Sequence, residues 1–180
     1  MGFLKEFVYR LRGDHTTEWL IAHGLTVGNN FKRLIGATID PSHCWLIDIG
    51  DNVTLAPRVS LIAHDASMWT ALGYTKIAPI HIGNRVFIGE NSVVLPGVTI
   101  GDDVIIGANS TVTHDVPSGC VFAGNPARLV NKTNTFIEKN QLKMQQSPCY
   151  GEEYTLRKNI SLSLMKQMKS DLQDACGYVK

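Results

Sequence analysis

The 180-residue sequence contains no apolar run close to the roughly 20 residues that a membrane-spanning helix requires. Its first residues place Lys5 and Glu6 among apolar side chains and lack the Ser or Thr of a myristoylation motif, so we expect neither a secretory signal peptide nor a myristoyl anchor. Lysine and arginine number 17 against 16 acidic residues, a net charge of +1 that provides no electrostatic basis for binding nucleic acid. We expect neither a nucleic-acid partner nor a firm membrane signal.

Cysteine is sparse and its spacing is unordered. The four cysteines, Cys44, Cys120, Cys149 and Cys176, are far apart and form no CxxC pair. Isolated cysteines of this kind are typical of reduced thiols, so the sequence predicts a cytoplasmic protein without structural disulfides.

The strongest signal is a repeat of six residues. An aliphatic residue recurs every six positions at Ile49, Leu55, Leu61, and again at Ile82, Ile88, Val94, Ile100, Ile106 and Val112. Most of these are followed four positions later by an aliphatic or small residue: Val53, Val59, Val86, Ser92, Val98, Val104, Ser110 and Val116. Glycine often follows the first position, as in IGDNVT, IGNRVF, IGENSV, IGDDVI and IGANST.

A period of six predicts a solenoid. Each unit would form a short strand and a turn, and three units would close one triangular coil with the aliphatic and small residues inside. Stability would come from stacked coils, because no unit buries its apolar face alone. The repeat glycines are expected to relieve corners where the backbone needs positive φ. Clear coils span residues 47–64, 80–97 and 98–115, and a fainter one precedes them, with Arg33 in an aliphatic position.

Three segments depart from this repeat, which we assign to residues 25–130. Residues 1–24 are expected to form a helical segment, whose stripe of Phe3, Phe7, Val8 and Leu11 would pack on the protein or, as the alternative, contact a membrane surface. Residues 65–79 interrupt two good coils and must leave the prism as a loop, where function often resides. After Pro117 the pattern is expected to end in the segment SGCVFAGNPARLV.

Residues 131–180 are expected to form a C-terminal helical extension. Its last helix, near residues 160–176, carries an apolar stripe of Ile160, Leu164, Met165, Met168 and Leu172. This stripe is expected to cover the open end of the solenoid or an adjacent subunit.

The run from Ile82 to Val130 resembles the hexapeptide-repeat acetyltransferases, and within them the sugar O-acetyltransferases that modify galactosides, maltose, capsule, O-antigen or exopolysaccharide. LPGVTIG and the later AGNPAR carry the resemblance, which covers roughly residues 25–130. It implies an all-β fold, a left-handed parallel β-helix with short N- and C-terminal α-helices. It also implies a homotrimer with active sites between subunits, and direct transfer from acetyl-CoA, the co-substrate, to a small-molecule or glycan acceptor.

The same resemblance places the catalytic histidine at the end of LAPRVSLIAH, which is His64. An acceptor hydroxyl has too high a pKa to attack a thioester at neutral pH, so a base must take its proton as the bond forms. Histidine, with an ordinary pKa of about 6.5, suits that role. His64 is therefore the predicted general base. Asp65 would orient the imidazole or the acceptor, or else serve as an ordinary turn residue.

Coenzyme A contacts are assigned by resemblance to Ala108 in the GANS unit, to Thr113 and to Arg128 after AGNPA. Arg128 would approach the nucleotide phosphates, to which its charge is attracted. His114 stands where the family usually has lysine and can meet phosphate only when protonated.

The acceptor site is predicted less directly. The coil before His64 carries ATIDP where related sugar acetyltransferases have an asparagine, which points to Thr38 or Asp40. The loop residues Asp65, Trp69 and Tyr74 are the other candidates, because aromatic faces stack on sugar rings and carboxylates hold sugar hydroxyls.

Two alternatives stay open. The acceptor could be an antibiotic, an amino sugar amine or serine, although HDASMW does not match the Met-Asp stretch of the antibiotic branch. The chain could also be a β-helix without acyltransferase activity, such as a γ-type carbonic anhydrase with zinc on three histidines. No ligand cluster of that kind is evident near His81, so no metal site is predicted.

Overall fold

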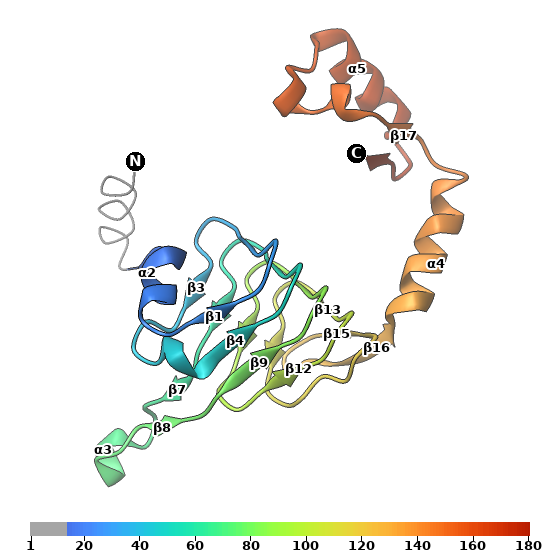
Figure 1. Cartoon of the computed structure of the whole chain (residues 1–180). Helices are drawn as coiled ribbons and strands as arrows, with labels where there is room; N and C mark the ends of the chain where they lie inside the picture. Colours follow the sequence, from blue (N-terminus) through green and yellow to red (C-terminus); the bar gives the residue numbers. More distant parts are fainter. Residues whose placement is uncertain (1–13) are drawn as a thin grey trace. The chain divides into compact units, whose positions relative to one another are not determined.

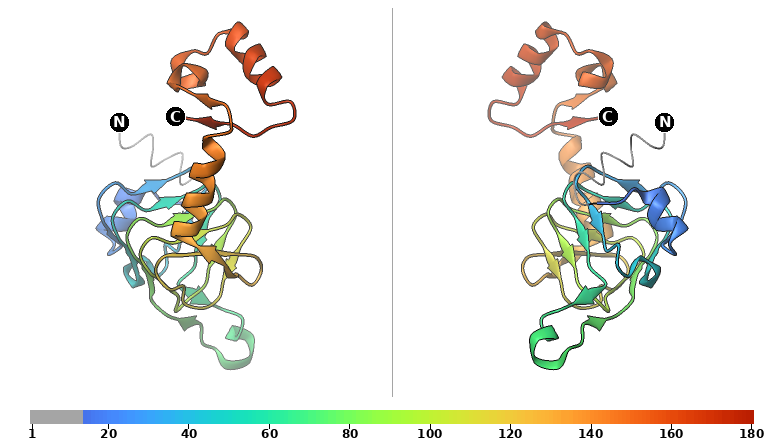
Figure 2. Two further views of the ribbon diagram at one scale, coloured as in Figure 1. Left: turned by 90° about the vertical axis from the view of Figure 1, so that its right-hand side faces the viewer. Right: turned by 90° about the vertical axis from the view of Figure 1, so that its left-hand side faces the viewer.

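The computed structural model describes residues 14–180, which form two compact units, residues 14–133 and 134–180. The first unit is a three-sided coil of short strands, here called the prism (Figures 1 and 2). The predicted N-terminal stripe of Phe3, Phe7, Val8 and Leu11 lies outside the described residues.

Each turn of the coil contributes one strand to each of three sheets, and the chain advances 18 residues per regular coil. The first sheet contains β1 (Thr26–Val27), β4 (Ile47–Ile49), β9 (Ile80–Ile82) and β12 (Thr99–Ile100). The second contains β2 (Lys32–Arg33), β5 (Thr54–Leu55), β10 (Phe87–Ile88), β13 (Ile105–Ile106), β15 (Cys120–Ala123) and β16 (Arg128–Lys132). The third contains β3 (Thr38–Ile39), β6 (Ser60–Leu61), β11 (Val93–Val94) and β14 (Thr111–Val112).

The predicted inward columns are confirmed. Every aliphatic position of the repeat from Ile49 to Val112 is at most 4% exposed. Burying each such side chain contributes about 1.5–3 kcal/mol. The two serines in the second column keep their hydroxyls satisfied, because Ser92 and Ser110 both donate to the carbonyl oxygen of Gly107 (2.9 and 2.7 Å).

The prediction that the repeat glycines supply positive φ is wrong. None of them has it: Gly28, Gly50, Gly83, Gly89, Gly101 and Gly107. They permit close stacking instead, since a Cβ on Gly89 would lie 2.5 Å from the backbone nitrogen of Ala108 in the next coil. Positive φ falls two positions later, as at Asn91 (φ 59°) and Asn109 (φ 55°), because asparagine tolerates the left-handed region better than most residues.

Both ends of the prism extend beyond the clear repeats. The fainter first coil is present, with β1, β2 and β3 parallel to β4, β5 and β6, and its extra residues form a 3-10 turn, η1 (Cys44–Leu46). At the other end, the segment SGCVFAGNPARLV, in which we expect the pattern to end, still contributes to the second sheet. Strand β15 adds another parallel strand to the second sheet, where Val121 is buried without a repeat glycine, and β16 folds back antiparallel on β15.

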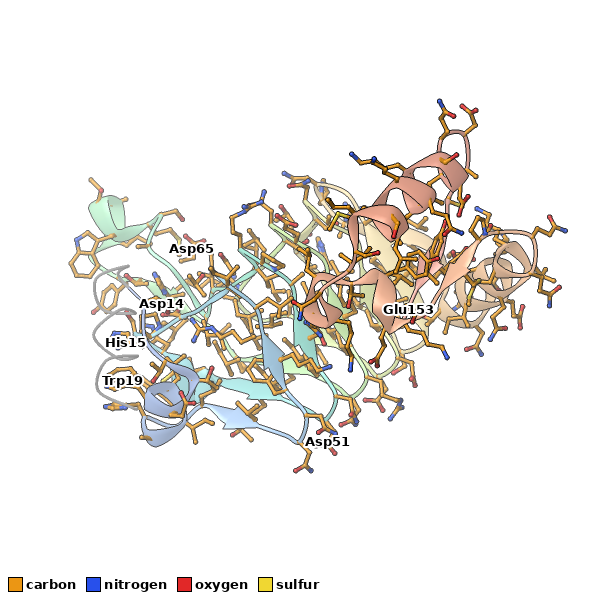
Figure 3. The ribbon with its side chains drawn as sticks, turned by 90° about the horizontal axis from the view of Figure 1, so that it is seen from above. Asp14, His15, Trp19, Asp51, Asp65 and Glu153 are labelled. Atoms are coloured by element: carbon orange, nitrogen blue, oxygen red, sulfur yellow. The ribbon has the colours of Figure 1, made fainter. Side chains whose placement is uncertain are left out.

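A short helix, α2 (Thr17–Ala22), packs on the first coil and adds Leu20 to the core. It begins at Thr16, whose hydroxyl oxygen accepts a hydrogen bond from the backbone nitrogen of Trp19 (3.1 Å). The rings of His15 and Trp19 stack with their centroids 3.8 Å apart at this end of the prism (Figure 3).

Arg33 occupies the inward position beside Leu55, although its side chain is charged. That side chain is 3% exposed. Its guanidinium group donates to the carbonyl oxygens of Ala37 (2.7 Å) and His15 (2.8 Å) and pairs with the carboxylate of Asp14. This position lies in the first coil of the described residues and ties the segment of Asp14 and His15 to the prism, which explains the departure from the aliphatic pattern.

Replacing Arg33 with alanine should lower the free energy of unfolding of the prism by about 3–5 kcal/mol, because Asp14 would keep a largely buried charge without its partner. Arg58→Ala is the matched control. It removes an ion pair with Glu90 in which both side chains are about half exposed or more, and it should cost less than about 1 kcal/mol.

Urea unfolding followed by tryptophan fluorescence would test this, since Trp19, Trp45 and Trp69 all lie in the first unit. Equal losses for the two variants would contradict the role given to Arg33.

Between β6 and β9 the 65–79 segment leaves the prism as an arm (Figure 1). The arm consists of β7 (His64–Asp65) and β8 (Lys76–Ile77), paired antiparallel, with the helix α3 (Trp69–Leu72) at its tip. No residue of α3 is buried.

The second unit contains α4 (Thr133–Met144), β17 (Cys149–Tyr150), η2 (Glu152–Tyr154), η3 (Leu156–Lys158), α5 (Leu162–Asp171) and β18 (Tyr178–Val179). Most of the predicted apolar stripe, Ile160, Met165, Met168 and Leu172, lines a groove of about 590 Å³, whereas Leu164 does not. What this face covers stays a prediction. In the described part of the chain no helix is long and apolar enough to span a bilayer.

Candidate active site

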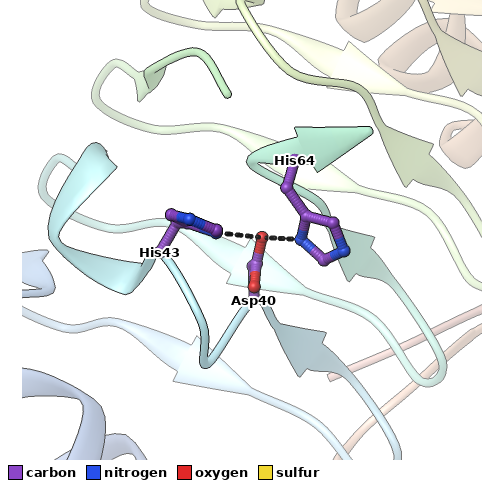
Figure 4. A group of neighbouring side chains, drawn as sticks. All are labelled: Asp40, His43 and His64. Atoms are coloured by element: carbon purple, nitrogen blue, oxygen red, sulfur yellow. Dashed lines mark hydrogen bonds and ion pairs between the residues drawn. The ribbon is translucent and has the colours of Figure 1, made fainter. Parts of the chain in front are cut away.

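His64 leaves the prism at the corner that follows the third sheet, and its side chain is 37% exposed. Asp40 follows β3, the neighbouring strand one coil earlier, so both side chains reach the same corner. The Nδ1 atom of His64 lies 2.5 Å from Oδ2 of Asp40 (Figure 4). A carboxylate only accepts hydrogen bonds, so we assign the ring hydrogen to Nδ1. The other ring nitrogen, Nε2, is then free to accept a proton.

The carboxylate of Asp40 is held rigidly, with its side chain 1% exposed. Oδ1 accepts from the backbone nitrogen of Ser42 (2.9 Å), and Oδ2 accepts from that of Ala63 (3.1 Å) as well as from His64. Sequence reasoning placed Asp40 among acceptor contacts. Its oxygens accept three hydrogen bonds from the protein, one of them from the imidazole, and its side chain also lines the cavity beside His64, so the acceptor contact stays a prediction.

Asp65 does not orient the imidazole. Its side chain is exposed on the arm, and Oδ1 accepts from the backbone nitrogen of Ser67 (2.9 Å). That hydrogen bond lowers the pKa of the Asp65 carboxyl below its ordinary value. In this chain the carboxylate that contacts the imidazole belongs to Asp40, whereas Asp65 has the hydrogen bond of an ordinary turn residue, the other expectation for it.

A cavity of about 260 Å³ opens beside His64. Its polar lining comes from Asp14, Thr38, Asp40, Ser60 and His64, and its apolar lining from Ile39, Pro41, Leu61 and Ile62. The hydroxyls of Thr38 and Ser60 are 3.0 Å apart and hydrogen-bonded. Paired hydroxyls beside a carboxylate suit a ligand that carries several hydroxyl groups. Sequence reasoning missed Asp14 and Ser60, although Ser60 shares its register with Thr38.

The arm residues do not join this cavity within the chain. Trp69 is 60% exposed and Tyr74 is 78% exposed, and neither lines the cavity. An acceptor bound beside His64 of the same chain is therefore contacted by the prism.

Two of the residues assigned to coenzyme A lie at the same corner as His64. Thr113 and His114 follow β14, which is two strands beyond β6 in the third sheet. Neighbouring strands lie about 4.8 Å apart, so this step is about 10 Å along the prism axis. The hydroxyl of Thr113 is 2.8 Å from Nδ1 of His114.

Of the other two coenzyme A candidates, one lies in a turn and the other at the first residue of a strand. Ala108 is exposed between β13 and β14. Arg128 is exposed at the start of β16, where its guanidinium group donates to the carbonyl oxygen of Ala127 (2.8 Å). The Ala127 backbone nitrogen donates to Thr111 on β14, which ties this segment to the third sheet (2.8 Å).

His43 is a further member of the site that sequence reasoning set aside. Its Nδ1 lies 3.9 Å from Oδ2 of Asp40, and its ring centroid is 5.7 Å from that of His64 (Figure 4). The sequence feature that could have identified His43 is the extra segment from His43 to Leu46, which follows the turn after Asp40.

Comparison with known proteins adds independent evidence. The family model described as "Bacterial transferase hexapeptide (six repeats)" matches residues 79–114, which cover the β9–β14 coils. Protein CapG of Staphylococcus aureus is 40% identical over 151 residues, 80% of this chain and 86% of CapG.

Two solved structures share the fold. A maltose O-acetyltransferase from Clostridium difficile 630 has a TM-score of 0.54 and 40% identity, and the match covers 61% of this chain and 59% of that one. A galactoside acetyltransferase in complex with coenzyme A has a TM-score of 0.58 and 38% identity, with 64% and 58% covered. This chain therefore spans somewhat under three fifths of each of these enzymes. Together with the near full-length match to CapG, the similarities establish that the chain belongs to the hexapeptide-repeat acetyltransferase family.

Proposed function

We propose that this protein transfers an acetyl group from acetyl-CoA to a hydroxyl of a sugar or of a cell-surface polysaccharide precursor, with His64 as general base. The observation that carries the proposal is the Asp40–His64 pair, in which Nδ1 of a partly exposed imidazole contacts the carboxylate, beside a cavity lined by hydroxyl groups. The names of the maltose and galactoside relatives support a sugar as acceptor.

The chemistry follows from this geometry. Nε2 of His64 takes the acceptor's hydroxyl proton as its oxygen attacks the thioester carbonyl. The resulting imidazolium is stabilised by the carboxylate of Asp40 at 2.5 Å. When the tetrahedral intermediate collapses, the carbon–sulfur bond breaks and the coenzyme A thiolate leaves with the proton held by His64. No acyl-enzyme is formed.

For the donor, we propose that coenzyme A lies along the prism from the corner of His64 toward Thr113 and His114, with Ala108 leaving room for its backbone. Arg128 would meet its phosphates, because its residue is exposed and its guanidinium group donates to the carbonyl oxygen of its own neighbour, Ala127. The coenzyme A in the galactoside acetyltransferase complex supports this donor.

Beyond one chain, we propose a left-handed coil that assembles as a homotrimer in the cytoplasm, where four free thiols persist. Family membership supports the winding and the assembly. In a trimer, the exposed Trp69 and Tyr74, together with Asp65, would contact an acceptor bound at a neighbouring prism.

An acceptor screen tests this proposal. Acetyl-CoA is mixed with the protein and with free sugars, nucleotide sugars, amino sugars or serine, and release of the coenzyme A thiol is followed. We expect thiol release with at least one hydroxylated sugar, and a product heavier by one acetyl group on oxygen. Release only with serine or with an amine, and N-acetylated or serine-acetylated products, would overturn the sugar assignment.

A further inference from the structure

The His43 imidazole has an unusual environment. Its Nδ1 atom is shielded from solvent and makes no hydrogen bond within residues 14–180. It lies 3.9 Å from a carboxylate oxygen of Asp40, too far for a hydrogen bond. Buried polar atoms nearly always have a partner, so an unpaired nitrogen that faces a buried carboxylate needs an explanation.

The three side chains together match the donor set of a zinc site. Asp40, His43 and His64 each offer one ligand atom, and these atoms all lie within 4.8 Å of one another. Tetrahedral zinc with bonds of about 2.0–2.2 Å separates its ligands by about 3.4 Å. The two measured separations, 2.5 Å from His64 and 3.9 Å from His43 to the Asp40 oxygen, fall on either side of that value.

The surroundings favour a cation as well. The Asp40 carboxylate is fixed by the backbone nitrogens of Ser42 and Ala63, the kind of outer support that orients metal ligands. His64 is 37% exposed and His43 is 24% exposed, so an ion can reach the cluster from solvent.

We propose that Asp40, His43 and His64 bind a zinc ion, and that the bound ion inhibits acetyl transfer. Zinc would take Nδ1 of His64 in place of the hydrogen bond to Asp40. The single hydrogen of the neutral ring then moves to Nε2, where it blocks acceptance of the acceptor's proton. The inhibition rests on the proposed function, whereas binding of the ion does not.

His81 provides a matched control. Its Nδ1 lies 2.9 Å from Oδ2 of Asp48, so it also forms a histidine–carboxylate pair, with both side chains half exposed. Among the described residues, Asp40, His43 and His64 form the only group of three potential ligands, and the His81 pair has no third member.

Zinc chloride would be titrated calorimetrically into chelator-treated full-length protein. We expect about one ion per chain in the wild type, an affinity at least about 10-fold weaker in His43→Ala, and wild-type affinity in His81→Ala. Cobalt(II) provides a second measurement, because its visible absorption bands report four-coordination and should lose intensity in His43→Ala. Wild-type zinc affinity in His43→Ala, or loss of binding in His81→Ala, would overturn the site.

Activity is measured separately, with each variant compared to its own metal-free rate. Zinc should inhibit the wild type and His81→Ala, a chelator should reverse the inhibition, and His43→Ala should need at least about 10-fold more zinc. Zinc that binds at the predicted site without slowing transfer would overturn the inhibitory role. If the protein proved to lack transferase activity, the calorimetry and the cobalt spectra would still decide whether the site exists.

Discussion

Replacing His64 with alanine is expected to lower the turnover number for acetyl transfer by at least about 100-fold, the lower range for loss of a general base. The acceptor hydroxyl would then have to attack the thioester without a nearby group to take its proton. The KM for acetyl-CoA should change little, because the residues assigned to the coenzyme lie about 10 Å farther along the prism. Steady-state kinetics read by thiol release would measure both quantities.

The fold should tolerate this substitution. The His64 side chain is 37% exposed and does not belong to the hydrophobic core. Urea unfolding and light scattering should therefore match the wild type. His81→Ala serves as the control, since it removes a half-exposed histidine paired with Asp48 on another face of the prism and should retain full turnover. Normal turnover in His64→Ala would remove His64 from the mechanism.

The interior of the prism could be predicted from local sequence because it depends on local spacing alone. A side chain six residues farther along the chain occupies the same position in the next side of the coil, so the columns from Ile49 to Val112 follow from the period. The glycines were found by the same pattern and explained incorrectly. The cause lies in the next coil and is invisible within one unit: a backbone atom 2.5–2.9 Å from the missing Cβ for five of the six glycines, and the Cβ of Ala123 at 2.8 Å for Gly107.

The active-site pair could not be predicted in the same way. Asp40 and His64 are 24 residues apart, a separation that is not one regular coil, because the η1 turn adds residues between them. Only the pairing of β3 with β6, in which Ile39 lies beside Leu61, brings the two side chains to one corner. Arg33 illustrates the same limit, since its partners Asp14 and His15 belong to a segment outside the repeat.

The corner after the third sheet concentrates the polar chemistry of the chain. Asp40 follows β3, and His64 follows the neighbouring strand β6. Thr113 follows β14, two strands beyond β6. Strands that stack in register fix the spacing of the residues that follow them, so these side chains are separated by multiples of about 4.8 Å along the prism axis. Side chains at this corner are free to depart from the aliphatic pattern because they lie outside the columns.

Asp40→Asn should lower the turnover number by at least about 100-fold while changing the KM for acetyl-CoA less than about twofold. The asparagine side chain has one acceptor oxygen and one amide nitrogen. If the nitrogen faces His64, it donates to Nδ1 and moves the ring hydrogen to Nε2, where the base is lost. The corresponding aspartate-to-asparagine change in a Ser–His–Asp triad costs about 10⁴-fold for this reason.

If the oxygen faces His64 instead, the amide nitrogen must meet the backbone nitrogen of Ser42, which is also a donor. In the first orientation the amide nitrogen meets the backbone nitrogen of Ala63 in the same way. Either orientation therefore leaves a buried donor without an acceptor, which should cost about 1–3 kcal/mol of stability. Turnover must therefore be corrected for the folded fraction, measured by urea titration under assay conditions. Asp48→Asn, in the half-exposed pair with His81, is the control and should keep both turnover and stability. A loss in Asp40→Asn that merely tracks the folded fraction would show that the carboxylate supports the fold without positioning the imidazole.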